Sequence, residues 1–171
     1  MQNTYQTKRL ILHEVSVHDE AFIRELVNTS EWLKFIGDRN VRTPEDAQLY
    51  IQNIICNPNS YYWIVRLKIE NISIGIVTFI KRDYLKHYDI GFALLLKYTK
   101  KGYAYEATTV VLNDAILNSS HTHISALTIK ENTDSIKLLE KLGLSFEEEI
   151  QQGNNLVSIF SAHLEKLIPD L

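Results

Sequence analysis

Apolar residues recur at two spacings along the chain, and these spacings predict where its helices and strands lie. Apolar positions three or four residues apart mark one face of a helix. This pattern predicts helices over residues 19–28, from 43 to about 57, 104–118 and 132–142, with a short second helix around 31–36 that ends at Gly37. Thr43-Pro44-Glu45-Asp46 is a typical helix start, because a capping hydroxyl is followed by a proline at the first helical position and then by two acids.

Alternating or continuous apolar runs predict the strands. They cover residues 9–13, 61–69, 72–80, 87–94, 121–129, 146–150 and 156–164. Glu70-Asn71 and Gly153-Asn154 each separate two neighbouring runs and predict hairpin turns. The expected order is β-α-α-β-β-β-α-β-α-β-β. It predicts an α/β (α+β mixed) fold, in which helices flank a mixed, mostly antiparallel sheet of about seven strands.

Composition narrows the class of protein further. A chain of 171 residues with 45% apolar content and no internal linker predicts one domain over residues 1–171. The net charge of −3, with basic residues spread along the chain, argues against a nucleic-acid binder. No apolar run approaches the roughly 18 residues of a membrane span. The first residues lack a signal-peptide pattern, and Cys56 is the single cysteine, so we expect a cytoplasmic protein.

The stretch from His87 to Ala107 is the chemically informative one. In the strand, Tyr88, Ile90, Phe92 and Leu94 form an apolar face, and the opposite face carries Asp89, Gly91 and Ala93. Three lysines follow, at positions 97, 100 and 101, and Gly102 directly precedes the predicted helix. Free N–H groups at a helix start can bind a phosphate group, and a glycine allows close approach. Taken alone, such a loop is more often simply solvated.

Four segments together resemble the GNAT family of N-acetyltransferases. Thr99-Lys100-Lys101-Gly102-Tyr103-Ala104 is similar to the family's pyrophosphate-binding pattern, Gln/Arg-x-x-Gly-x-Gly/Ala. Asp89-Ile90-Gly91-Phe92 resembles the acid-Ile-Gly-aromatic run on its fourth strand. The segment 131–144 resembles Asn-x-x-Ser-x-x-x-x-Glu-Lys-x-Gly-Phe. Thr7-Lys8-Arg9-Leu10-Ile11-Leu12 resembles the start of the branch that contains ribosomal-protein alanine N-acetyltransferases. The segments occur in the family's order and at its spacing.

The resemblance implies an acyl-CoA-dependent N-acyltransferase that uses acetyl-CoA as co-substrate and needs no metal. It also implies a set of cofactor-binding residues: Phe92, Leu94, Thr99, Lys100, Lys101, Gly102, Tyr103, Ala104 and Asn132. Two positions depart from the pattern, since Thr99 replaces arginine or glutamine and Lys100 stands where this branch commonly has glycine. Because backbone amides would be the main phosphate donors, binding can survive both changes.

The resemblance further implies two catalytic residues. Asp89 matches the family's acid and would accept the proton of the attacking amine, and Ser135 would donate a proton to the departing sulfur. Each has an alternative role. Asp89 could be a structural acid, with water relays as the base, and Ser135 could satisfy N–H groups in the first turn of its helix. Asn132 could cap the same helix while it binds the pantetheine arm.

The acceptor would be an amine, either a peptide N-terminus or a small molecule, and the protein a monomer or a homodimer. Trp32, Tyr61, Tyr62 and Trp63 could line its pocket, although core packing is the simpler role for them. The run 147–149 of three glutamates could attract a cation or form a solvated strand edge. His121 and His123 lack a third ligand for a metal.

Two other classes of protein are alternatives to the enzyme. A non-catalytic CoA-binding regulator would keep the loop and lack productive acid and base geometry. A nucleotide-binding enzyme is poorly supported, because the chain contains neither Gly-x-x-x-x-Gly-Lys-Ser/Thr nor Gly-x-Gly-x-x-Gly.

Overall fold

The computed structural model describes residues 1–118, 121–153 and 155–167. Within them one sheet has the strand order β1-β2-β3-β4-β5-β6-β8-β7. The strands are β1 (Thr4–Gln6), β2 (Leu10–Glu14), β3 (Ser60–Leu67), β4 (Ser73–Lys81), β5 (Tyr88–Leu94), β6 (His123–Thr128), β7 (Ser145–Gln152) and β8 (Asn155–His163). Neighbours pair antiparallel except β5 and β6, which are parallel. The predicted mixed, mostly antiparallel sheet is confirmed.

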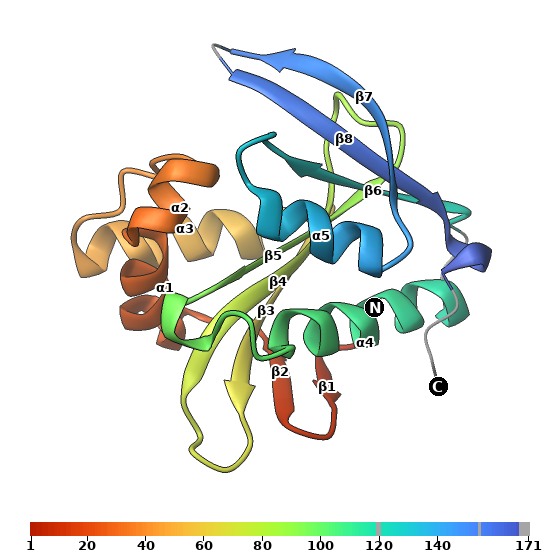
Figure 1. Cartoon of the computed structure of the whole chain (residues 1–171). Coiled ribbons are helices and arrows are strands. Elements are labelled where there is room, and N and C mark those ends of the chain that lie inside the picture. The colour runs from red at the N-terminus through yellow and green to blue at the C-terminus, as the bar shows by residue number, and fades with distance from the viewer. Residues whose placement is uncertain (119–120, 154, 168–171) are drawn as a thin grey trace.

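Helices cover both faces of this sheet (Figure 1). They are α1 (Glu20–Val27), α2 (Ser30–Phe35), α3 (Pro44–Ile55), α4 (Tyr103–Asn118) and α5 (Thr133–Lys141), with short 3-10 turns η1 (Val17–Asp19), η2 (Leu96–Tyr98) and η3 (Leu164–Lys166). The start of α3 follows the sequence signal: the Asp46 N–H donates to Thr43 Oγ1 (3.1 Å) and the Thr43 N–H donates to Asp46 Oδ2 (2.8 Å).

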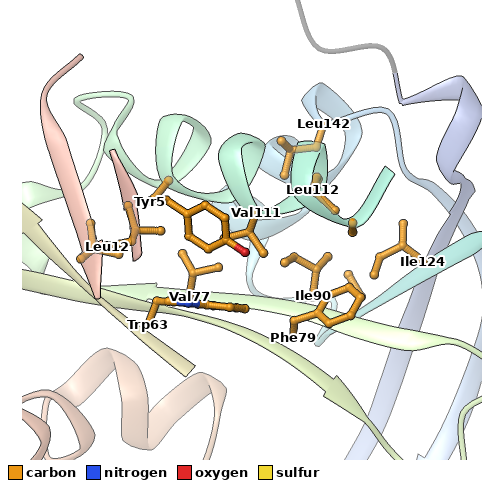
Figure 2. Packing of buried hydrophobic residues seen from close by; sticks show 14 of the residues in the cluster. Tyr5, Leu12, Trp63, Val77, Phe79, Ile90, Val111, Leu112, Ile124 and Leu142 are labelled. Atoms are coloured by element: carbon orange, nitrogen blue, oxygen red, sulfur yellow. The ribbon is translucent and has the colours of Figure 1, made fainter. Parts of the chain in front are cut away.

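Two hydrophobic clusters lie on the two faces of the sheet. The larger one packs α4 and α5 against residues from β1 to β6 and β8, including Tyr5, Trp63 and Phe79 (Figure 2). The smaller one packs α1, α2 and α3 against the opposite face, where Ile64 and Ile76 are fully or almost fully buried. The apolar side chains of β3 and β4 are therefore divided between two helical layers, because neighbouring side chains in a strand point to opposite faces.

The sheet opens between its two parallel strands. β5 pairs with β4 along its whole length, from Tyr88 to Leu94. Its register with β6 contains only the pairs Tyr88↔Ile124 and Asp89↔Ser125. Beyond Asp89 the described strands diverge, so the edge of β5 that faces β6 is left without a ladder partner. This opening positions the site described below.

The structure differs from the sequence prediction at several element ends. β1 is an additional strand, so the sheet has eight strands where about seven were predicted. The short helix predicted around 31–36 forms as α2, so three helices precede β3 where the expected order has two. The turn after β3 is wider than Glu70-Asn71, because β3 ends at Leu67 and β4 begins at Ser73. Of the predicted turn at Gly153-Asn154, the second residue lies outside the described residues.

Asp114 is a carboxylate within the apolar stripe of α4, and the missed strand β1 explains it. The Tyr5 hydroxyl donates to Asp114 Oδ2 at 2.8 Å, and the Gln2 N–H donates to the same oxygen at 3.2 Å. Both Tyr5 and Asp114 are buried. A buried carboxylate needs such donors, so the polar position in α4 serves to attach the first strand.

Candidate active site

The loop between β5 and α4 is held in a conformation with two positive φ angles. Lys100 has φ +58° and Gly102 has φ +80°. This left-handed region suits glycine and is costly for other residues, which accounts for the glycine that the resembled pattern has in place of Lys100. The Thr99 hydroxyl donates to Leu96 O (2.8 Å), so the shorter side chain at this position closes the 3-10 turn η2.

Arg9, from the chain segment before β2, braces the loop from outside. Its Nη1 donates to Lys101 O at 2.9 Å, and its guanidinium lies 4.4 Å from the centre of the Tyr103 ring. Glu106 holds it in place, since Arg9 Nε donates to Glu106 Oε2 at 2.6 Å and the Arg9 N–H donates to Oε1 at 2.8 Å. Burial would raise the pKa of Glu106, but the donors from Thr7 and Arg9 prevail and lower it, so the carboxylate stays charged.

Two sets of backbone N–H groups border the opening of the sheet. The Glu106 N–H donates to Gly102 O (3.0 Å), so the N–H groups of the preceding residues in the first turn of α4 have no intrahelical partner. Directly after β5 the Leu95 N–H donates to Ile74 O of β4 (2.9 Å). Because N–H groups alternate along a strand, those of Phe92 and Leu94 point away from β4, toward the opening.

A cavity of about 310 Å³ lies where the sheet opens. Its lining comes from α2 and the loop after it, from the α3-side face of β3 to β5, and from β6, α5 and the β7–β8 hairpin. Four predicted site residues line it: Asp89, Phe92, Asn132 and Ser135. Asp89 and Phe92 precede Asn132 and Ser135 by at least 40 positions in the sequence, and the opening of the sheet brings the two pairs to one space.

Asp89 lies at the point where β5 and β6 part, and it is 2% exposed. Arg82 Nε donates to Asp89 Oδ2 at 2.7 Å, and the Leu127 N–H of β6 donates to the same carboxyl group. Burial raises the pKa of Asp89 above its usual range, although Arg82 and the Leu127 N–H act in the opposite direction. A carboxylate with a raised pKa is a stronger proton acceptor than a solvated one.

Asn132 and Ser135 lie at the start of α5, on the β6 side of the cavity. Asn132 Oδ1 accepts the Ser135 N–H at 3.2 Å, which makes Asn132 the N-cap of the helix. The capping role uses only the carbonyl oxygen of the Asn132 side chain, so its amide group stays available. The Ser135 side chain is half-buried and lines the cavity.

The remaining predicted site residues lie outside this cavity. Leu94, the last residue of β5, and residues 99–104, which lead into the first turn of α4, do not line it. Lys100 Nζ lies 3.4 Å from Asp134 Oδ2 across exposed surface, which connects the loop to the start of α5. The candidate site is therefore elongated: it runs from the loop along the free edge of β5 to Asp89.

The aromatic residues divide between pocket and core. Trp32 and Tyr62 line the cavity. Tyr61 packs against the larger cluster, and Trp63 is buried in it with its Nε1 donating to Gln2 O (3.0 Å). In a strand neighbouring side chains point to opposite faces, so Tyr62 alone of the three faces the cavity. The glutamates 147–149 lie on β7, an exposed edge strand, and do not line the cavity.

Several residues that shape the site were missed in the sequence. Arg9 belongs to a quoted segment, yet its contact with Glu106 spans 97 positions and has no local signal. Arg82, the partner of Asp89, lies in a polar turn after β4, where a solvated side chain would be expected. A buried carboxylate requires a partner, but the sequence does not show that Asp89 is buried, so it gave no signal for a cation beside it.

The histidines contact aromatic rings and one another. His121 lies against Tyr88 and Phe79, with ring centres 4.4 and 5.9 Å apart, and His123 stacks on His87 at 4.8 Å. Over residues 1–118, 121–153 and 155–167 there is no group of three or more His, Cys, Asp or Glu side chains that could hold a metal ion. The same residues contain no helix long and apolar enough to cross a membrane.

The opened sheet, the loop before α4 and the cavity with its buried acid agree with the acyltransferase that the sequence predicts. The family model of the acetyltransferase (GNAT) domain matches residues 9–145, and the chain belongs to this family of N-acetyltransferases. The uncharacterized N-acetyltransferase YnaD of Bacillus subtilis (strain 168) is 30% identical over 152 residues, which are 86% of this chain and 88% of that protein. The family and the enzyme class predicted from the sequence are thus confirmed.

Solved structures share the fold. The ribosomal-protein-S5-alanine acetyltransferase of Vibrio fischeri superposes with a TM-score of 0.81 at 20% identity, over 98% of this chain and 100% of that one. The spermidine N-acetyltransferase of Vibrio cholerae, solved with CoA and spermine, superposes with a TM-score of 0.79 at 17% identity, over 94% and 99%. At these identities the likeness concerns the fold alone.

Proposed function

We propose that this protein transfers an acetyl group from acetyl-CoA to a primary amine by direct attack, in the cavity that Asp89, Asn132 and Ser135 line. The observation that carries this proposal is the opening of the sheet. It leaves the N–H groups of Phe92 and Leu94 pointing into the gap, between the loop and a buried acid. Such an arrangement suits a long ligand with phosphates at one end and a reactive carbonyl at the other.

The residues of this chain would hold acetyl-CoA through its backbone. The first-turn N–H groups of α4 and the lysines at positions 97, 100 and 101 would bind the pyrophosphate, and Gly102 keeps side-chain atoms out of that space. Phe92 and Leu94 N–H groups and the Asn132 amide would bind the pantetheine arm. When bound, acetyl-CoA supplies a thioester carbonyl that an amine can attack.

Two side chains would move protons in this reaction. A new C–N bond forms while the C–S bond breaks, so the amine must lose a proton and the sulfur must gain one. Asp89 would accept the amine proton, through a water where the acceptor does not reach it, and the Ser135 hydroxyl would donate to the sulfur. The raised pKa of Asp89 supports its assignment as the base.

The direct test is release of free CoA in the presence of amines. We expect thiol release that depends on both acetyl-CoA and an amine, with acetylated product identified by mass spectrometry. The amine panel should include amino acids, peptides with free N-termini, polyamines and aminoglycosides. Tight binding of acetyl-CoA without turnover for any amine would favour the alternative function, a CoA-binding regulator on the same fold.

Arg9→Met should weaken acetyl-CoA binding by about tenfold, since it removes two charge-assisted hydrogen bonds that hold the loop. Titration calorimetry measures the effect. Lys8→Met is the matched control, because Lys8 is exposed and lies next to Arg9. A variant that binds acetyl-CoA like the wild type would show that the loop keeps its shape without Arg9.

We further propose that residues 1–171 act as one domain, in the cytoplasm, as a monomer or a homodimer. The absence of an internal linker supports the first statement, and a single cysteine suits the reducing compartment of the second. The acceptor can be a peptide N-terminus or a small molecule, and the charge of the cavity narrows this choice.

A further inference from the structure

The charged side chains that line the cavity include more cations than carboxylates. Among the described lining residues they are Lys34, Arg39, Arg82 and Asp89. Asp89 already pairs with Arg82 at 2.7 Å. Lys34 and Arg39 therefore give the cavity an excess of positive charge that its one carboxylate does not neutralise.

Arg39 lies on the loop between α2 and α3, and the acid next to it is already engaged. Asp38 pairs with Arg42, and its Oδ1 accepts the Asn40 N–H at 2.7 Å. The loop turns at Gly37 and Asn40, with φ of +99° and +56°. These turns place Arg39 at the cavity, where its guanidinium hydrogen-bonds the Tyr50 side chain.

The neutral groups beside Arg39 are also donors. Tyr50 and Tyr62 both line the cavity. Burial raises the pKa of Tyr50, and burial together with the neighbouring Tyr50 raises that of Tyr62 to about 12. Both hydroxyls therefore keep their protons at neutral pH. The α2–α3 side of the cavity thus presents cations and hydroxyl donors, which are the partners that a carboxylate requires.

We propose that the acceptor amine carries a carboxylate group, which Arg39 binds at the α2–α3 side of the cavity while the amine faces Asp89. This inference rests on the proposed acetyl transfer. A polyamine would bring further positive charges to a surface that already has an excess of them, so the cavity disfavours it. The same cations favour the neutral form of the amine, which is the form that attacks.

Two sources can supply such a carboxylate: a free amino acid, or a peptide N-terminus followed by an acidic side chain. The volume of about 310 Å³ must also hold the reacting end of acetyl-CoA. That volume lies at the low end of ligand pockets, which favours the amino acid.

The test compares amines that differ only in the carboxylate. The wild-type protein and acetyl-CoA are assayed for thiol release with L-amino acids, with the corresponding amino-acid amides, and with spermidine. We expect kcat/KM to be at least about tenfold higher for the best amino acid than for its amide. Peptides Ala-Glu-Ala and Ala-Gln-Ala form a second pair, in which a preference confined to the acidic peptide would identify the peptide source.

Arg39→Gln should remove this preference. We expect kcat/KM for the carboxylate substrate to fall by about tenfold or more, with the amide substrate and the KM for acetyl-CoA unchanged. Arg24→Gln is the matched control, because Arg24 lies on α1 and does not line the cavity. Equal activity with acid and amide, a preference for spermidine, or an Arg39→Gln variant that keeps the preference would each overturn the inference.

The two proposals fail in different ways. Turnover of spermidine or amides alone would contradict the proposal that the acceptor carries a carboxylate, but it would support acetyl transfer. If no amine is acetylated, the transferase proposal fails. Calorimetric titration of the same amino acids and amides into the CoA-saturated protein then tests independently of turnover whether the cavity binds a carboxylate. Equal affinity for acid and amide in that titration would overturn it.

Discussion

Gly102→Glu should abolish acetyl-CoA binding, with a loss of affinity of at least about 100-fold. At this position φ is +80°, and a Cβ atom would lie 3.3 Å from Arg9 Nη2. The glutamate therefore adds bulk where the backbone must approach a phosphate. It also places a negative charge beside the two negatively charged phosphates of the pyrophosphate. Like charges placed together at an interface cost several kcal/mol.

Gly102→Ala separates the backbone effect from the charge. It keeps the cost of a side chain at positive φ, which is about 1 kcal/mol, and adds no charge. We expect a loss of affinity of about fivefold for this variant, and melting temperatures of the two variants that lie close together. Calorimetric titration of each variant with acetyl-CoA and with CoA measures the two affinities. If the glutamate variant bound as well as the alanine variant, the pyrophosphate would not lie on residues 99 to 104.

The sequence predicted the individual elements of this site better than their arrangement. The period of two along 88–94 was enough to divide β5 into a face with Ile90 and Phe92 in the larger cluster and a face with Ala93 in the smaller one. The capping residues Thr43 and Asn132 were also recognisable, because helix starts depend on a few neighbouring positions. Such features are local, so the sequence alone determines them.

Contacts across many positions could not be predicted in this way. The ion pair of Arg82 with Asp89, the attachment of Asp114 to Tyr5 and the brace from Arg9 to Glu106 each join separate elements. An isolated polar residue in an apolar stripe indicates only that some partner exists. Likewise the positive charge of the cavity depends on Arg39, whose loop has no periodic pattern that would place it beside β5.

Asp89→Asn should lower kcat by about 100-fold if Asp89 is the base, because a neutral amide cannot accept the amine proton. The ion pair of the buried Asp89 with the half-buried Arg82 makes loss of stability a second consequence, since the substitution leaves the Arg82 charge without its partner. Thermal unfolding of the variant with and without acetyl-CoA measures that consequence separately. A structural role alone would predict a lower melting temperature and a kcat that, per folded molecule, equals that of the wild type.

The pH profile of Arg82→Gln decides between these two roles. Activity needs the deprotonated Asp89 carboxylate, so kcat/KM should fall as the pH falls through the pKa of Asp89, which burial holds above its usual range. Arg82 opposes this effect of burial, and its removal should therefore raise the pKa of Asp89 further and move the acidic limb of kcat/KM to higher pH. This limb reports groups of the free protein and the free amine. The free amine is the same in both assays, so a shift of the limb reports Asp89. An unshifted limb in a folded variant would assign the proton transfer to another group.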